Sequence, residues 1–306
     1  MRCALGFCLI IVCLVGCASR KPMPSNAQAT SLLGKPLFSP EVPGDQRAKL
    51  DANLAAAQVA FHSDPSEDNA VWLGRRLAYL GHYKEAIDVF TQALERYPDS
   101  AKLLRHRGHR YITIRRFDDA IHDLGWATDN IRNRPDEIEP DGAPNARNLP
   151  RSTLNSNIWY HLGLAHYLKG SYEHAAMAFG MCLDFSRDND DKLVSTSYWL
   201  YLSRMRTGDQ AGAAAILQDI RPDMDVIENQ SYHRLLLCFK GAIKPGEVVQ
   251  GDDTLANPTI AYGLAIRRVL RGEAVAAKTD FERIVANPNW GAFGYIAAEA
   301  ELARSK

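Results

Sequence analysis

The chain has 306 residues, of which 46% are hydrophobic and 24% are charged. This composition is typical of a globular protein and excludes a disordered or collagen-like chain. The 36 lysines and arginines balance 36 aspartates and glutamates. Such neutrality argues against general nucleic-acid binding, which favours a strongly basic surface. The length suffices for one large domain or two ordinary ones.

The first part of the sequence contains a short apolar segment. Arg2 precedes an uncharged, mostly apolar run over residues 3–16. A helix of that length rises about 21 Å, which is too short to cross a hydrocarbon core of roughly 30 Å. We therefore predict a signal peptide over residues 1–16.

The end of this segment, LVGC at residues 14–17, resembles the lipobox of bacterial lipoproteins. The resemblance implies that Cys17 is lipidated and becomes the mature N-terminus. Ala18 follows it, and no aspartate stands there as an inner-membrane retention signal. Resemblance to lipoproteins of diderm bacteria thus favours the periplasmic side of the outer membrane over the inner membrane. The alternative is a secreted protein with a coincidental cysteine.

The next segment lacks a helical pattern. Residues 18–45 are rich in Pro, Ser and Gly, so we expect 17–45 to be the lipidated cysteine and a flexible tether. From residue 46 onward, apolar residues recur at helical spacing, at Leu50, Leu54, Ala57 and Phe61.

A repeat of 34 residues follows, with small residues at corresponding places. The first helix of successive units contains Gly74, Gly108 and Gly163, and the second contains Ala86, Ala120 and Ala175. Together with the neighbouring Leu, Tyr and Phe positions, this pattern resembles the tetratricopeptide repeat (TPR). The resemblance implies pairs of antiparallel helices that approach closely at the small residues and bury their apolar faces against neighbouring pairs.

We therefore expect residues 46–306 to form an all-α, TPR-like, right-handed superhelical solenoid. The expected units lie near 67–100, 101–134, 156–189, 194–221 and 259–288, with a proline-rich insertion at 129–155 and a closing helix at 291–304. The prolines of the insertion forbid a continuous helix there, and loops of such length are usually functional or disordered.

A basic segment precedes the insertion. Residues 102–116 contain six lysines or arginines, two histidines and no acid. In the TPR family the first helix of each unit lines a concave groove that binds extended peptides. The resemblance places six residues in such a groove: Arg75, Lys102, Arg105, His109, Asn157 and Tyr160. Arginine offers a bidentate fork, so this groove suits a carboxylate or phosphate.

Acidic residues of the insertion offer a second interpretation. Asp136, Glu137, Glu139 and Asp141 could fold back and pair with Arg105, Arg107 or Arg110. Arg107 suits such pairing because its place in the unit normally holds a packed leucine, and a charge there needs a partner or access to water. Intramolecular pairing, an anion-binding groove and an ordinary solvated face all remain open, and the first two coexist if the insertion acts as a lid.

Little in the sequence indicates an enzyme. Common catalytic and nucleotide-binding motifs are absent, and we predict no catalytic residues, metal or cofactor. Cys182 and Cys238 lie in apolar contexts, which favours two buried free thiols over a disulfide. The competing hypothesis is an envelope hydrolase or metal-dependent enzyme, which convergence of His109, His161 and Glu139 would favour.

The expected function is protein binding in the bacterial cell envelope. In its lipobox, tether, repeats and closing helix, the chain is similar in architecture to NlpI-type adaptor lipoproteins, which bring together enzymes of cell-wall turnover. The resemblance implies a scaffold with a protein partner of unknown identity, membrane contact through the lipid alone and no nucleic acid. A role in secretion or outer-membrane assembly fits the same anchor.

Overall fold

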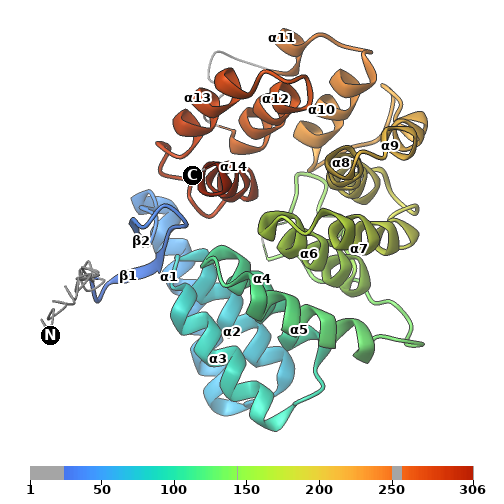
Figure 1. Ribbon diagram of the computed structural model, residues 1–306. Helices are drawn as coiled ribbons and strands as arrows, with labels where there is room; N and C mark the ends of the chain where they lie inside the picture. Colours follow the sequence, from blue (N-terminus) through green and yellow to red (C-terminus); the bar gives the residue numbers. More distant parts are fainter. Residues whose placement is uncertain (1–23, 143, 250–256, 306) are drawn as a thin grey trace, which may run out of the picture.

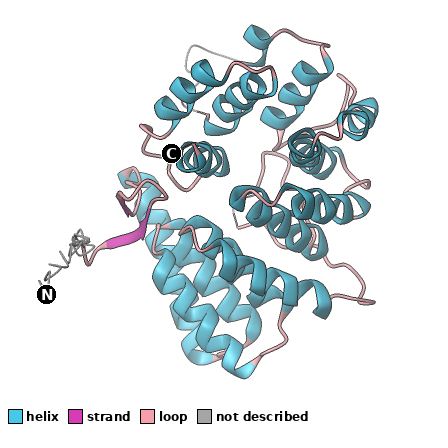
Figure 2. Cartoon of the chain, in the orientation of Figure 1, coloured by secondary structure: helices cyan, strands magenta, loops and turns pink. Residues whose placement is uncertain are grey.

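The computed structural model describes residues 24–142, 144–249 and 257–305, and these form a curved stack of antiparallel helix pairs (Figure 1). Figure 2 shows that strands are confined to one short hairpin near the start of the described chain. The predicted fold class, an all-α solenoid, is confirmed. The predicted signal peptide and Cys17 lie outside the described residues.

The helices follow one another in pairs joined by short turns. Their bounds in chain order are α1 (Gly44–Ser63), α2 (Glu67–Tyr79), α3 (Tyr83–Arg96), α4 (Ala101–Thr113), α5 (Phe117–Asn130), α6 (Leu154–Lys169), α7 (Tyr172–Asp184), α8 (Asp190–Thr207), α9 (Gln210–Ile216), the 3₁₀ helix η1 (Leu217–Asp219), α10 (Gln230–Lys240), α11 (Pro245–Val248), α12 (Pro258–Leu270), α13 (Ala274–Ile284) and α14 (Phe293–Arg304).

Small residues let the paired helices approach as the repeat pattern predicts. A methyl group added at Gly74 would overlap the Phe90 ring, and one at Gly163 would overlap the Phe179 ring. The alanines of the second helices, Ala86, Ala120 and Ala175, are fully buried. Close packing of this kind leaves no room for an extra carbon atom without movement of the neighbour.

Glycine also ends helices where the backbone turns left-handed. Gly170 follows α6 with a φ of 92°, and its N–H hydrogen-bonds the carbonyl of Tyr167. Gly81 adopts a φ of 77° in the turn between α2 and α3. Both turns are as short as the pattern requires because glycine adopts this conformation at little cost.

The described part of the expected tether is not flexible. Strand β1 (Ala27–Thr30) pairs antiparallel with β2 (Pro36–Phe38), and Ala27 is fully buried. The side chain of Gln28 accepts a hydrogen bond from the backbone N–H of Lys84 at the start of α3, at 3.1 Å. Residues 24–43 therefore belong to the folded body, and they cover the first helix pairs.

The C-terminal helix closes the curve. Figure 1 shows α14 between the N-terminal helix pairs and α12–α13, close to the hairpin. Glu299 of α14 pairs with Arg115 in the α4–α5 turn at 2.7 Å and accepts a hydrogen bond from the N–H of Leu32 at 2.6 Å. The indole of Trp290 donates to the carbonyl of Phe38 at 2.7 Å. The concave groove that the resemblance implies is therefore partly covered by the chain itself.

The proline-rich insertion is ordered at its two ends. It runs from the end of α5 at Asn130 to the start of α6 at Leu154, close to the predicted span. Its ends meet where the N–H of Glu139 donates to Ser152 at 3.1 Å and the N–H of Leu154 donates to Glu137 at 2.9 Å. Glu137 and Glu139 are thus held close to α4 and α6.

Candidate functional site on the inner wall

The basic helix α4 begins at a serine cap, since the side chain of Ser100 accepts a hydrogen bond from the N–H of Leu103. From this helix Arg105 points to the insertion, where its guanidinium lies 3.1 Å from a carboxylate oxygen of Glu139. The amide of Asn157 on α6 donates to the other oxygen at 2.8 Å. Two of the predicted groove residues, Arg105 and Asn157, thus hold a carboxylate of the same chain.

This pair is almost fully buried, since Arg105 is 8% exposed and Glu139 is 9% exposed. His106 adds a ring nitrogen 3.3 Å from Glu139. Of the three interpretations of the basic helix, intramolecular pairing describes Arg105. Burying two charges is costly unless both are paired and hydrogen-bonded, and Glu139 meets that requirement through three side chains.

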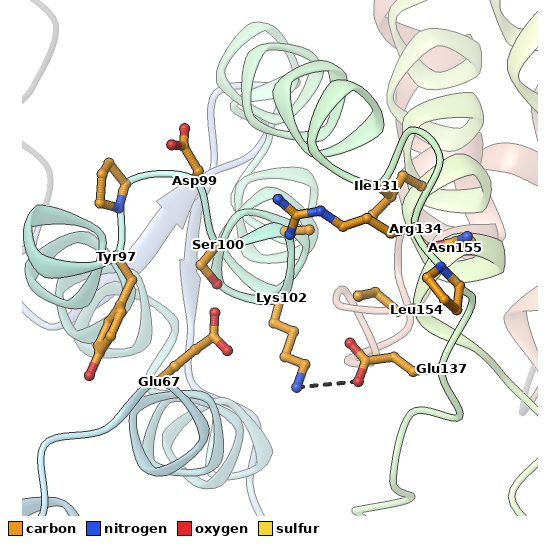
Figure 3. Close-up of a pocket in the computed structure, with 13 residues that line it drawn as sticks. Glu67, Tyr97, Asp99, Ser100, Lys102, Ile131, Arg134, Glu137, Leu154 and Asn155 are labelled. Atoms are coloured by element: carbon orange, nitrogen blue, oxygen red, sulfur yellow. Dashed lines mark ion pairs between the residues drawn. The ribbon is translucent and has the colours of Figure 1, made fainter.

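Lys102, one turn earlier, lies nearer the surface. Its amine is 3.3 Å from Asp68 and 3.4 Å from Glu137, and Figure 3 shows it directed at the Glu137 carboxylate. The two residues line a cavity of about 420 Å³ between the start of α4 and the insertion. Partial burial opposes the charged amine, but the two carboxylates outweigh it and raise the pKa of Lys102.

The other acidic residues of the insertion do not contact the basic helix as expected. Asp136 accepts hydrogen bonds from the N–H groups of Glu137 and Asn155, at 2.9 and 3.0 Å, and so orders the start of α6. One oxygen of Asp141 is buried without a hydrogen-bond partner in the described chain. Burial raises the pKa of this carboxyl group.

Arg107 does not pair with the insertion. It donates two hydrogen bonds, at 2.6 and 2.8 Å, to the carboxylate of Asp123 on α5. The correct partner therefore comes from the second helix of its own unit, which faces the position normally filled by leucine. The sequence signal was available, because an arginine and an aspartate replace apolar residues on facing helices.

His109 and Tyr160 lie on the inner wall, but the closing helix covers them. The ring centre of Phe293 lies 5.4 Å from that of His109 and 6.5 Å from that of Tyr160. The repeat pattern predicts which residues face the groove but not which distant segment covers them. The role of Phe293 therefore could not be predicted from the sequence. Arg75, the sixth groove residue, donates to the hydroxyl of Tyr79 at 3.3 Å and stacks over Trp72 at 4.4 Å.

His109 and His161 come together, with ring centres 4.2 Å apart. Burial lowers the pKa of both imidazoles well below the usual value, and Arg105 and Arg110 add to the effect. Glu139 does not join them as a third ligand, and no group of three or more potential metal ligands occurs among the described residues. The convergence that would favour a metal-dependent enzyme is thus incomplete.

A cavity of about 340 Å³ opens on the inner wall between α6, α8, α10 and α14, and we call it the central cavity. Arg105, His109, Asn157 and Tyr160 line it together with residues absent from the prediction, chiefly Arg151, Asp191, Lys192 and Ser195. Its charges are paired: Arg151 contacts Asp191 at 3.0 Å and Lys192 contacts Asp188 at 2.7 Å. The central cavity therefore offers hydrogen-bonding groups without a large net charge.

Two further observations concern chemistry and the membrane. Cys182 and Cys238 are buried free thiols, as predicted. Cys182 borders the central cavity, and burial raises its pKa to about 11, so it is an unreactive thiol near neutral pH. Over the described ranges, the structure contains no helix with the length and apolar character needed to cross a membrane.

The stacked helix pairs define a helical-repeat solenoid, a class whose curved surfaces typically bind other macromolecules. Within this class the chain contains a tetratricopeptide repeat. Residues 69–100, which span α2 and α3, match the model of the tetratricopeptide repeat family, and the same glycine and alanine packing recurs in the following pairs. Proteins of this family generally act as scaffolds rather than as enzymes.

Solved structures with a similar course of the chain include the following three proteins. A tetratricopeptide repeat protein from Parabacteroides merdae is 14% identical, with 85% of this chain and 94% of that chain covered and a TM-score of 0.48. PilW, a type IV pilus biogenesis factor, is 16% identical, with 79% and 88% covered and a TM-score of 0.48.

YrrB, a TPR protein with an unusual peptide-binding site, is 11% identical, with 76% of this chain and 93% of that chain covered and a TM-score of 0.43. No curated protein matches the sequence significantly. At such identities and scores these likenesses carry nothing about ligands, and the family assignment rests on the repeat match and the helix packing.

Proposed function

We propose that this protein is a non-enzymatic interaction scaffold that binds a segment of a partner protein in the central cavity. The observation that supports this proposal is the carboxylate of Glu139, which is held by Arg105 and Asn157, two residues that line that cavity. An acidic side chain of the partner would replace Glu139 on the same two groups. The insertion then acts as a displaceable internal ligand over an anion-binding wall.

We further propose that the scaffold works in the bacterial cell envelope, anchored through lipid on Cys17 and facing the periplasm from the outer membrane. Support comes from the apolar leader and the LVGC segment. A single diacyl-type anchor at the N-terminus would tie the folded body to the lipid surface without a membrane-spanning helix. The partner is then another envelope protein.

Crosslinking in the native envelope, followed by identification of captured proteins, tests the binding site. Ser195→Trp places a large ring in the central cavity without removing a charged residue, and Thr279→Trp on the exposed face of α13 is the matched control. We expect the wild type and Thr279→Trp to capture the same partner and Ser195→Trp to lose it. Capture unaffected by Ser195→Trp would place the partner elsewhere on the solenoid.

A second variant examines the displacement of the insertion. Glu139→Gln keeps the shape of the side chain but weakens its attraction to Arg105, so the internal ligand competes less well. We expect this variant to capture more partner than the wild type. Unchanged or reduced capture, with the protein folded by circular dichroism, would contradict the exchange of carboxylates.

The anchor is tested separately. Metabolic labelling with a fatty-acid analogue should label the wild type, and Cys17→Ser should abolish the label and release the protein from the membrane fraction. Labelling that persists in Cys17→Ser would refute lipidation at this residue. Density separation of inner and outer membranes then assigns the membrane.

A further inference from the structure

A second, smaller cavity lies between α2 and α4. Its volume is about 140 Å³, and we call it the arginine cavity because Arg75, Arg105 and Arg110 line it. Glu139 borders it from the insertion, and the remaining wall includes Tyr79 and Phe90. Three guanidinium groups therefore surround a space that holds a single carboxylate from the protein.

The charges of this lining do not balance. Three arginines against one glutamate leave a formal charge of 3 − 1 = +2. The two histidines in the lining, His106 and His109, add no charge near neutral pH, because burial and the neighbouring arginines lower the pKa of both imidazoles. Like charges in a poorly solvated space repel each other strongly.

Two of these arginines leave part of their charge or hydrogen-bonding capacity unmatched. The Nε of Arg105 is buried without a hydrogen-bond partner in the described chain, although the residue is only 8% exposed. Arg110 forms no ion pair with any described residue, and its guanidinium lies over the ring of Tyr83, 5.6 Å from the ring centre. Arg105 is buried and Arg110 is partly buried, and charges removed from water normally have a counter-charge or a hydrogen-bonded partner.

The pKa of Arg110 agrees with the lack of a counter-charge. Burial, together with repulsion from Arg105 and Arg75, lowers its pKa to about 10. Asp141 senses the field of Arg75, but it does not line the cavity and no ion pair joins the two in the described chain. No acid of the described residues therefore neutralises Arg110.

We propose that the arginine cavity binds a dianionic tetrahedral oxyanion of the size of phosphate. Two negative charges match the formal excess, and several oxygens could accept from the free Nε of Arg105 and from the guanidinium of Arg110. Planar guanidinium groups are well suited to phosphate oxygens because they donate two parallel hydrogen bonds. This site shares Arg105 and His109 with the central cavity but adds Arg75 and Arg110, and it does not depend on the proposed partner.

Thermal unfolding and calorimetric titration of the full chain with inorganic phosphate, in chloride buffer at constant ionic strength, test the proposal. A ligand that binds only the folded state raises the unfolding temperature as its concentration increases. We expect a rise of a few degrees for the wild type and for Arg132→Met, an exposed arginine paired with Asp129 outside the cavity. Arg110→Met should show no rise.

Arg110→Met has a second expected effect that separates it from simple damage. Because its charge is repelled by two arginines and has no counter-ion, its loss should leave the phosphate-free unfolding temperature equal to or above that of the wild type. Arg75→Met is the replacement if Arg110→Met does not fold, and it should also lose the phosphate response. A wild type that does not respond to phosphate, or an Arg110→Met response equal to that of Arg132→Met, would overturn the proposal.

Two further ligands define the chemistry. Acetate, a monoanion, should give a much weaker response than phosphate, and an equal response would refute a dianion site. Glycerol 3-phosphate carries the same dianionic group on a larger body. A response weaker than that to phosphate identifies the free ion, and an equal response identifies a phosphomonoester, both at the same three arginines.

Discussion

Two buried arginine–glutamate pairs hold different parts of this molecule, and they differ in how completely they are satisfied. Arg115 and Glu299 join the α4–α5 turn to α14, and their side chains are 2% and 0% exposed. Arg115 also donates to the carbonyls of Thr113 and Trp290. By contrast, Arg105 leaves its Nε unpartnered beside two cavities, although Glu139 is well bound.

The Arg115–Glu299 pair is structural, whereas the Arg105–Glu139 pair is suited to the exchange of its carboxylate for that of a ligand. Arg115 and Glu299 use nearly all their hydrogen-bonding capacity within the protein, so a ligand has nothing to offer them. Arg105 has spare capacity, and its partner belongs to an insertion between repeats rather than to a helix of the solenoid. A buried ion pair beside a cavity is therefore the better candidate for ligand binding.

Breaking the closing pair should have the largest effect. Glu299→Ala leaves Arg115 buried without its carboxylate and also removes the acceptor of the Leu32 N–H. Leaving one partner of a buried pair uncompensated costs roughly 3–5 kcal/mol of unfolding free energy, measurable by urea denaturation. Arg132→Ala, which removes an exposed pair, should change stability by less than about 0.5 kcal/mol. Similar losses for both variants would contradict a structural role for the closing pair.

Acidification should destabilise the part of the fold around Arg105, where His109 of α4 and His161 of α6 lie. The pKa values of His109 and His161 are lowered in the folded state. Below pH 6.5, the ordinary pKa of a histidine in the unfolded chain, the unfolded state therefore binds more protons than the folded state. The stability they contribute is present above that pH and is lost as the pH falls. From pH 6.5 to 5.5 each histidine should reduce the unfolding free energy by about 1 kcal/mol.

Denaturation curves at several pH values measure this loss. His161→Gln should remove the share of one buried histidine, about 1 kcal/mol between pH 6.5 and 5.5. Hydrogen exchange should increase in α4 and α6 before it increases in α14. The reverse order would show that the closing pair, rather than the Arg105 region, responds to acid.

Glu139→Gln should have a smaller effect than Glu299→Ala. Glutamine keeps an oxygen for Arg105 and loses only the charge, so we expect a loss of roughly 1–2 kcal/mol in unfolding free energy. Hydrogen exchange of the Glu139 and Leu154 amides should rise while that of α14 stays unchanged. A loss as large as that of Glu299→Ala would make the two pairs equivalent and remove the distinction drawn between them.

The parts of the fold predicted from sequence are those that depend on neighbours in the chain. Gly74 and Phe90 belong to one helix pair, so their contact recurs at each repeat and leaves a periodic signal. The pairing of Arg105 with an acid of the insertion is among the predicted alternatives because the insertion follows soon after the basic helix in the chain. The Arg107–Asp123 pair lies within one unit and was within reach of the same reasoning.

The missed features depend on distant contacts. Leu32 and Glu299 are 267 residues apart, and Arg115 and Glu299 are 184 apart, so no local pattern brings them together. The composition of the hairpin formed by β1 and β2 is that of a loop and therefore predicts a tether, whereas its order comes from contacts with α3 and Trp290. The contact of Phe293 with His109 also joins distant parts of the chain, so no local pattern predicts it.

The junction of α14 with the hairpin and the α4–α5 turn has a consequence for folding. In an open repeat protein each unit interacts only with adjacent ones, so the terminal units unfold first and independently. Here the two terminal regions hold each other through Glu299 and Trp290. Fraying at either end must therefore break contacts at both, which makes unfolding more nearly all-or-none and the folding reaction slower than local contacts alone would give.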